Sequence, residues 1–215
     1  MIKKKTFFII LIIAIIFSLP LLSGCLKNRE VFTHDDLKRT YILHLPSNFS
    51  SDNTYPLVLV FHGGGGNAEN IADTTNFSQK ADEEDFIVVY PDGTGKLKQR
   101  LLTWNAGFCC GYALENDIDD VDYIKSLITH LQTQYPINES MIYATGLSNG
   151  GIMTYRLGAE LSTIFAAIAP VAAQIGGQPS VEEELWCIPE PTNPVSVLAF
   201  HGTNDRRVPY DRSEE

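Results

Sequence analysis

Short apolar segments alternate with amphipathic segments along most of the chain. Residues 57–61 (LVLVF) and 86–90 (FIVVY) are rich in β-branched and aromatic side chains and contain no charged residue. Runs of this kind are typical of strands that are covered on both faces. Further strands are predicted at residues 39–46, 141–145, 165–171 and 195–200.

Amphipathic segments with helical periodicity lie between these predicted strands. The clearest spans residues 119–135, where apolar residues recur every three to four positions and acidic residues occupy the first turn, which suits the helix dipole. Two more helices are predicted over residues 70–84 and 149–161. Alternation of strands and helices predicts an α/β fold, with a mostly parallel sheet and helices on both faces.

The first residues have the pattern of a secretion signal. Lysines at positions 3–5 precede an apolar run at 7–17, which is short for a helix that spans a bilayer. Residues 22–25 (LSGC) then resemble a lipoprotein processing box, in which Cys25 becomes the acylated first residue. An uncleaved anchor, or a cleaved signal with an incidental cysteine, is the alternative, and each places the domain outside the cytoplasm.

These patterns divide the chain into three parts. We predict a lipoprotein-type signal peptide over residues 1–24, a polar tether over 25–38 and one α/β domain over 39–215. The lipid on Cys25 would anchor the domain to the membrane, so the expected localisation is extracytoplasmic.

Composition and charge exclude several classes of protein. An apolar fraction of 44% and a charged fraction of 20% are those of a globular domain, and the formal net charge is −10. The basic residues form no stripe, so a nucleic-acid backbone would be repelled and no nucleic-acid partner is expected. Paired CxxC units of the kind that bind zinc are absent from the sequence, and neither a metal nor a cofactor is predicted.

Residues 146–150 (GLSNG) fit the pattern G-x-S-x-G. They follow a predicted strand and precede a predicted helix, which is the context of a nucleophile elbow. This turn would expose the hydroxyl of Ser148 at the edge of the sheet. The amides at the start of the following helix, Asn149 among them, would face negative charge that develops on an acyl substrate.

Residues 62–66 (HGGGG) end an earlier predicted strand. Glycines at this position present bare amides to a carbonyl oxygen. Either Gly64 or Gly65 would complete an oxyanion hole with the Asn149 amide, and the sequence does not distinguish them. A flexible turn or a phosphate loop is the alternative, although no GK[ST] follows as a phosphate loop requires.

Two more side chains are candidates for the same site. Asp205 follows the last predicted strand and could orient a catalytic histidine, as the acid of a triad does. The alternative is an aspartate that closes the turn before Val208. Trp104, in a long predicted loop, is a candidate for the wall of a substrate cleft, although tryptophans more often belong to the core.

Residues from about 55 to 210 resemble the family of secreted polyhydroxybutyrate-depolymerase-like and feruloyl or acetylxylan esterases, which are α/β-hydrolases. The blocks that carry the resemblance are FHGGGGN, YPDGTG, TWNAGFCCGYALENDIDDVDYI, YATGLSNGGIMTYRL, APVAA and FHGTNDRRVPY. The resemblance implies an extracellular serine esterase with Ser148 as nucleophile and Asp205 as acid. Its substrates would be feruloyl or acetyl esters of polysaccharide, or a short polyhydroxyalkanoate.

Three cysteines remain when Cys25 is set aside, an odd number in a compartment where thiols tend to pair. Because adjacent cysteines bridge each other only with strain, the expected disulfide joins Cys187 to Cys109 or Cys110. The third thiol would be a buried free cysteine, or its partner would belong to chain not present here. The family resemblance also implies that Cys109 or Cys110 belongs to a disulfide.

The sequence lacks a histidine after Asp205, although the triad of this fold runs Ser, Asp, His along the chain. His201 is the nearest candidate for a substitute base, but the resemblance makes it part of the turn that shapes the acid's loop. The chain also ends where a helix, a final strand and a last helix are expected. We therefore expect an α/β-hydrolase domain that lacks its final strand and helix and is nearly inactive alone.

Two other functions fit parts of this pattern. A non-catalytic, surface-anchored carbohydrate-binding lipoprotein derived from the esterase fold would explain the missing histidine. It would not explain the intact residues 146–150 and Asp205. A peptidase on the same fold is also compatible with the motifs.

Overall fold

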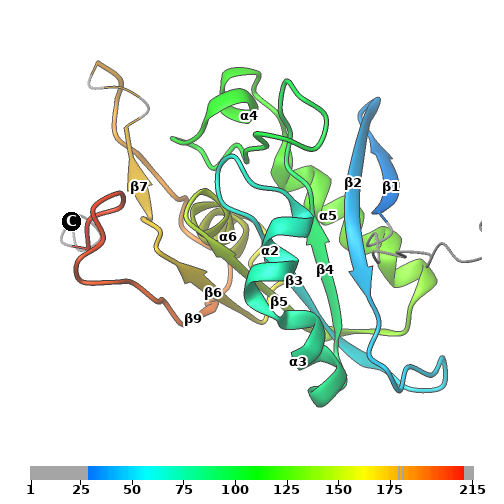
Figure 1. Ribbon diagram of the computed structural model, residues 1–215. Helices are drawn as coiled ribbons and strands as arrows, with labels where there is room; N and C mark the ends of the chain where they lie inside the picture. The colour runs from blue at the N-terminus through cyan, green and yellow to red at the C-terminus, as the bar shows by residue number, and fades with distance from the viewer. Residues whose placement is uncertain (1–28, 179, 181, 211–215) are drawn as a thin grey trace, which may run out of the picture.

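The computed structural model describes residues 29–178, 180 and 182–210, so the predicted signal peptide and Cys25 lie outside the described residues (Figure 1). A seven-stranded sheet, in the order β1-β2-β4-β3-β5-β6-β9, forms the centre of the molecule. Its strands are β1 (Arg29–His34), β2 (Leu37–His44), β3 (Tyr55–Phe61), β4 (Ile87–Pro91), β5 (Ile137–Leu147), β6 (Ala167–Val171) and β9 (Ser196–Val197). Strands β4, β3, β5, β6 and β9 run parallel, and the β1–β2 hairpin joins β4 antiparallel.

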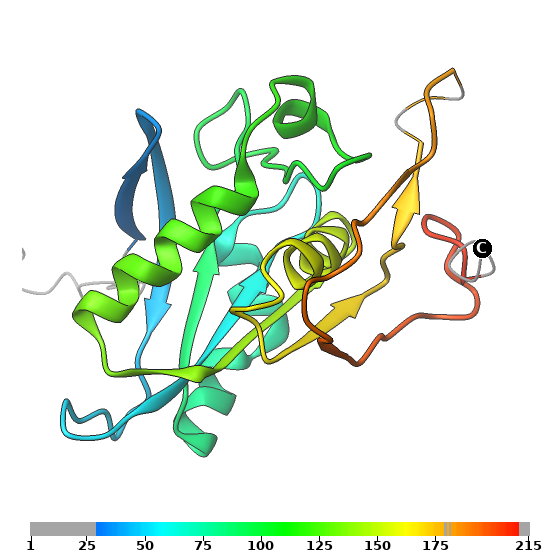
Figure 2. The same ribbon diagram turned by 180° about the vertical axis from the view of Figure 1, so that it is seen from behind.

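Helices cover both faces of this sheet, which confirms the predicted α/β class. On one face lie α5 (Asp120–Gln134) and α6 (Asn149–Glu160), and Figure 2 shows α5 running across that face. The opposite face carries α2 (Ala68–Thr75) and α3 (Phe77–Glu84). The short elements are α4 (Gly111–Glu115) and a two-stranded ribbon, β7 (Gly176–Gly177) with β8 (Trp186–Cys187).

The apolar run of β3 explains this layering. Leu57, Leu59 and Phe61 are fully buried in the cluster shared with α5 and α6. Val60 packs with α2 and α3 on the other face, because successive side chains of a strand point to opposite faces. A strand that is covered twice therefore needs apolar residues at consecutive positions.

The segment predicted as a polar tether is partly structured. Residues 29–34 form β1 and pair with β2, in a register from Arg29–Ile42 to His34–Leu37. The Arg29 guanidinium lies 3.1 Å from an Asp92 carboxylate oxygen, and the Phe32 ring lies 4.9 Å from that of His130. These long-range contacts hold a polar segment in the sheet, so the tether boundary at residue 38 is wrong.

Two other predicted elements differ in extent. The helix predicted at 70–84 is two helices, because Asn76 adopts a left-handed conformation with φ 55° between them; asparagine tolerates this region better than most residues. The strand predicted at 195–200 is reduced to β9, with one further bridge between Val171 and Phe200. Among the described helices, none combines the length and the apolar character needed to cross a bilayer.

Candidate active site

The turn between β5 and α6 holds Ser148 in a strained conformation. Its φ of 55° and ψ of −121° lie outside the regions that L-residues prefer, and its amide donates to the Val171 carbonyl at 2.9 Å. The side chain is half-buried and caps no helical amide. Ser148 therefore has the strand–turn–helix setting that was predicted for a nucleophile.

The glycines of this turn allow its close approach to β3. A Cβ at Gly150 would lie 2.5 Å from the Phe61 carbonyl oxygen, and one at Gly146 would lie 2.8 Å from the Phe61 Cβ. Real Cβ atoms do not approach other atoms this closely. The two glycines are thus required by the packing of the elbow against the strand that leads into the glycine loop.

The glycine loop after β3 faces Ser148. A Cβ at Gly63 would lie 3.7 Å from the Ser148 Cβ, and one at Gly64 would lie 3.6 Å from the Asn149 Cβ. The Gly65 amide donates to the Leu102 carbonyl at 2.8 Å, so it is already engaged. The Gly64 amide has no acceptor among the described residues. Of the two glycines considered from the sequence, Gly64 is therefore the one whose amide remains available to an oxyanion, beside Asn149 at the start of α6.

His62 holds the glycine loop through both of its ring nitrogens. Nε2 lies 3.0 Å from the Gly93 amide, which can only donate, and Nδ1 lies 2.8 Å from the Gly63 carbonyl, which can only accept. These contacts fit a neutral ring with its proton on Nδ1. Burial lowers the pKa of His62, which also favours the neutral form.

The lowered pKa of His62 predicts a loss of stability in mild acid. Below the ordinary histidine pKa of about 6.5 the unfolded chain takes up a proton that the folded chain does not. The free energy of unfolding should therefore fall with decreasing pH, by up to ~1.4 kcal/mol per pH unit for this one group. Denaturant titrations at pH 7.5 and 5.5 would measure the fall.

The matched comparison for this prediction is His62→Gln against His130→Gln, because His130 is a partly exposed histidine on α5. The His130→Gln protein should lose as much stability as the wild type, and the His62→Gln protein should lose less. If His62→Gln does not fold, NMR titration of the His62 ring in the wild type replaces it. A ring that becomes protonated at or above pH 6.5 contradicts the prediction.

The Asn149 side chain joins the elbow to the long loop after β4. Its Oδ1 accepts from the Trp104 amide at 2.8 Å, and its Nδ2 donates to the Trp104 carbonyl at 3.0 Å. The sequence pattern predicts a role for the backbone amide of Asn149 and none for its side chain. An asparagine directly after the nucleophile was the available signal, but its partner lies 45 residues away in sequence.

Trp104 was considered as a wall of the substrate cleft, and the structure places it in the core instead. Its ring is fully buried, packs edge-on against Phe61 with centroids 5.2 Å apart, and its Nε1 donates to the His62 carbonyl at 3.1 Å. Because tryptophan combines a large apolar surface with one donor, it supports the base of the glycine loop. It contributes no surface to a substrate.

Asp205 lies in the loop after β9. Its Oδ1 accepts from the Arg207 and Val208 amides at 2.8 and 3.0 Å, as in the turn-closing alternative. These two hydrogen bonds lower the pKa of the Asp205 carboxyl group, and the bond from the Val208 amide has the larger effect. Its Oδ2 lies 3.9 Å from His201 Nε2. No contact between Asp205 and Ser148 occurs among the described residues.

The histidines of the chain all have other partners. His201 Nε2 donates to the Val208 carbonyl at 2.7 Å, which leaves it no proton-accepting role at that nitrogen. Of the others, His34 lies beside Asp122, His44 beside Asp82 and His130 beside Gln134. Within the described range, no histidine is hydrogen-bonded to the Ser148 hydroxyl.

The cysteines pair differently from the prediction. Cys109 is bonded to Cys110, its neighbour in sequence, and Cys187 carries a free, exposed thiol. A bridge from Cys187 to one of the pair is therefore absent from the described structure. Cys109 lies close to the site, because its sulfur is 4.0 Å from the Asn149 Nδ2.

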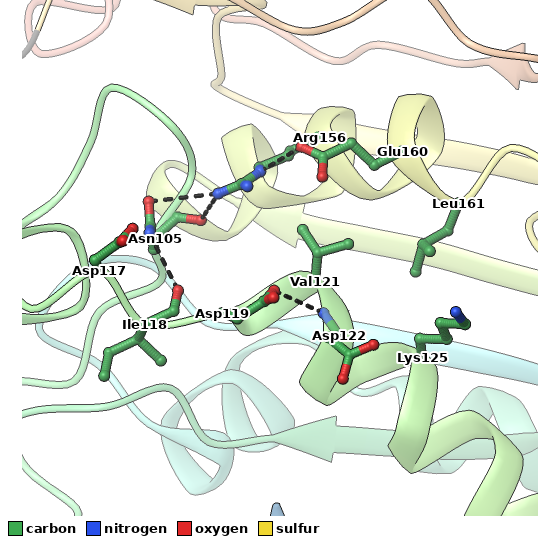
Figure 3. A pocket seen from close by; sticks show the side chains of 10 residues that line it. All are labelled: Asn105, Asp117, Ile118, Asp119, Val121, Asp122, Lys125, Arg156, Glu160 and Leu161. Carbon is green, nitrogen blue, oxygen red and sulfur yellow. Dashed lines mark hydrogen bonds and ion pairs between the residues drawn. The ribbon is translucent and has the colours of Figure 1, made fainter. Parts of the chain in front are cut away.

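One cavity among the described residues does not have Ser148 in its lining. It has a volume of about 370 Å³ and lies between α5, α6 and the preceding loop (Figure 3). Arg156 crosses it, with Nε 2.6 Å from Glu160 and Nη1 2.8 Å from the Asn105 carbonyl. Because neither Ser148 nor a residue of the glycine loop lines it, this cavity is a less suitable acyl site than the elbow.

The parallel sheet, the elbow and the glycine loop together define an α/β-hydrolase. Solved structures agree with this fold class. A thermostable esterase superposes with a TM-score of 0.61 at 22% identity, covering 87% of this chain and 49% of the other. A ferulic acid esterase from Anaeromyces mucronatus, solved with ferulic acid, gives a TM-score of 0.59 at 17% identity, covering 85% and 74%.

The chain belongs to the Esterase PHB depolymerase family, whose sequence model matches residues 39–180. It is 30% identical over 174 residues to feruloyl esterase B of Piromyces equi, which covers 80% of this chain and 30% of that protein. It is 31% identical over 174 residues to the putative esterase NocK of Nocardia uniformis subsp. tsuyamanensis, covering 80% and 47%. The chain thus spans less than half the length of these two relatives.

Proposed function

We propose that the protein is an extracytoplasmic serine esterase that hydrolyses carboxylic esters through an acyl-enzyme on Ser148. The observation that carries the proposal is the strained turn at Ser148, with φ 55°, set directly against the glycine loop. Membership of an esterase family supports it. No other described serine combines a positive φ with a helix N-terminus and free backbone amides.

The reaction follows from these positions. Ser148 Oγ attacks the ester carbonyl carbon while its proton passes to a base, and the carbonyl oxygen gains negative charge between the Gly64 and Asn149 amides. Collapse of this intermediate breaks the ester C–O bond, and the alcohol leaves with the proton. Water then attacks the acyl-enzyme in the same way, which releases the acid and restores the Ser148 hydroxyl.

None of the described histidines is placed to act as the base that accepts the Ser148 proton. His62 is engaged at both nitrogens, and His201 donates to Val208. We infer that the intact protein provides a histidine from outside residues 29–210, oriented by Asp205. The hydrogen bonds that lower the pKa of Asp205 support this, because they keep the carboxylate ionised.

A fluorophosphonate probe tests the proposal and the role of the base together. A chain extended through the downstream reading frame should be labelled on Ser148. Residues 1–215 alone should react about 10²- to 10⁴-fold more slowly, which is the usual contribution of a positioned base. An extended chain that folds and is not labelled would overturn the esterase and favour the carbohydrate-binding alternative.

The substrates proposed are feruloyl or acetyl esters of polysaccharide, or a short polyhydroxyalkanoate. The names of relatives support the first pair: feruloyl esterase B, and a bifunctional acetylxylan esterase/xylanase of Neocallimastix patriciarum that is 28% identical. Rates on matched ester and amide substrates separate the esterase from a peptidase. A higher kcat/KM on the amides would overturn the assignment to esters.

We also propose that the protein is anchored to the membrane through a lipid on Cys25. The support is the sequence pattern alone: lysines, an apolar run and the LSGC box at 22–25. Incorporation of a labelled fatty acid that is lost in Cys25→Ala is the expected result, and equal incorporation by both proteins contradicts it.

A further inference from the structure

A second cavity lies beside the glycine loop, between the β1–β2 hairpin and the loop that follows β4. Its volume is about 350 Å³, within the usual range for small-molecule sites. Much of its lining is aliphatic, and two lysines from opposite sides complete it. The aliphatic residues of the lining include Leu37, Leu97, Leu102 and Ile118, and the lysines are Lys38 and Lys98.

The cavity is connected to the glycine loop by the backbone. Leu102, in its lining, accepts the hydrogen bond from the Gly65 amide, and Gly93, also in its lining, donates to His62. Both contacts lie at the carboxyl edge of the parallel strands, where open α/β sheets bind their ligands. A molecule in this cavity would therefore lie across the glycine loop from Ser148.

The lining brings two lysines of an acidic protein to the same cavity. The chain has a net charge of −10, yet Lys38 and Lys98 have no carboxylate within ion-pair distance among the described residues. Among the other described lysines, Lys80 pairs with both Glu83 and Glu84 on α3, whereas Lys96 and Lys125 have no ion pair either. Two cations without partners at an aliphatic cavity attract an anion with an apolar body.

The buried charges in the lining do not cancel this attraction. The Asp92 carboxylate accepts from Arg29, from the Thr40 hydroxyl and from the Ala68 amide, so its oxygens are already bonded. Arg39 is paired with Asp120. Its Nε and the Thr94 hydroxyl are buried and have no hydrogen-bond partner among the described residues, although both residues line the cavity.

We propose that this cavity binds the free carboxylate end of an aliphatic ester substrate, with Lys38 and Lys98 as its cationic contacts. The proposal rests on the proposed function, and it narrows the substrate to linear esters that carry a terminal carboxylate. Leu37, Leu97 and Leu102 contact the aliphatic chain. The ester group then lies toward the glycine loop and Ser148.

Binding to the inactive Ser148→Ala protein tests this without turnover. The linear trimer of 3-hydroxybutyric acid and its methyl ester differ at one end, which is a carboxylate in the acid and an uncharged methyl ester in the other. By calorimetry at low salt, the acid should bind about threefold to tenfold more tightly, as expected from two partly exposed ion pairs. The preference should shrink at 1 M salt, because exposed charges are then screened.

Two variants of the Ser148→Ala protein are compared. One also carries Lys38→Gln and Lys98→Gln, and the control also carries Lys125→Gln. Lys125 lies on α5 and lines the other cavity. The double replacement should abolish the preference for the acid, and the control should keep it. Equal binding of acid and methyl ester, or a preference that survives the double replacement, overturns the proposal.

A second pair of ligands, octanoate and octanamide, shows whether the bound carboxylate belongs to a fatty acid or to an ester substrate. If octanoate is preferred and the hydroxybutyrate acid is not, the cavity is a fatty-acid site and its assignment to an ester substrate is wrong. Labelling of Ser148 by a fluorophosphonate does not depend on these lysines. A failure of this binding proposal is therefore distinguishable from a failure of the esterase function.

Discussion

Replacement of Ser148 by alanine is expected to lower kcat for ester hydrolysis by the intact protein about 10⁶-fold. In the proposed mechanism the acyl-enzyme forms on this hydroxyl, so its loss should leave only the catalysis that binding and the oxyanion amides supply. Hydrolysis of a short nitrophenyl ester, followed at saturating substrate, measures the effect. KM should change little, because the amides of Gly64 and Asn149 remain.

The control for this replacement is Ser140→Ala, an exposed serine on the same strand β5. It should retain full activity. Ser148→Ala should also keep the stability of the wild type, since the Ser148 side chain makes no capping hydrogen bond and alanine has the same backbone restrictions. If turnover survives in Ser148→Ala, the nucleophile is another residue and the account fails.

The second large effect is expected at the buried pair of Arg39 and Asp120. Arg39 Nη2 lies 2.7 Å from Asp120 Oδ1, and the Asn105 amide donates to Asp120 Oδ2 at 2.8 Å. Both side chains are almost completely buried, and the Arg39 guanidinium lies 3.8 Å from the centre of the Tyr123 ring. The pair thus joins β2, the loop that contains Asn105 and the start of α5.

Asp120→Ala should reduce the free energy of unfolding by about 3 to 5 kcal/mol, because it leaves a buried guanidinium without its partner. Urea denaturation measures the change. The double replacement Arg39→Met, Asp120→Leu should be much less harmful, since neither charge then remains buried. A double variant that is as unstable as Asp120→Ala would show that the packing around these side chains, and not the unpaired charge, is responsible.

Much of the site could be predicted because its signals are local in sequence. The turn at 146–150 and the glycines at 62–66 each follow a buried strand within a few residues, and backbone geometry at such turns restricts the residue type. The same local reasoning predicted the α/β class. It also correctly placed α5, whose apolar spacing and acidic first turn are both visible in the sequence.

The contacts that were missed join residues far apart in sequence. Arg29 pairs with Asp92 across 63 positions, which draws a polar segment into the sheet. The Asn149 side chain bonds Trp104 across 45 positions, which places that tryptophan under the glycine loop and not in a cleft. Periodicity does not reveal such pairs. Similarly, the break at Asn76 depends on one residue that adopts a positive φ.

The most direct test of this account is the structure of the extended chain after reaction with a phosphonate. The phosphorus should be bonded to Ser148 Oγ, and its phosphoryl oxygen should lie about 2.7 to 3.1 Å from the Gly64 and Asn149 amides. The Gly65 amide should still donate to Leu102. An adduct on another residue, or a phosphoryl oxygen directed away from both amides, would contradict the assignment of this elbow as the catalytic centre.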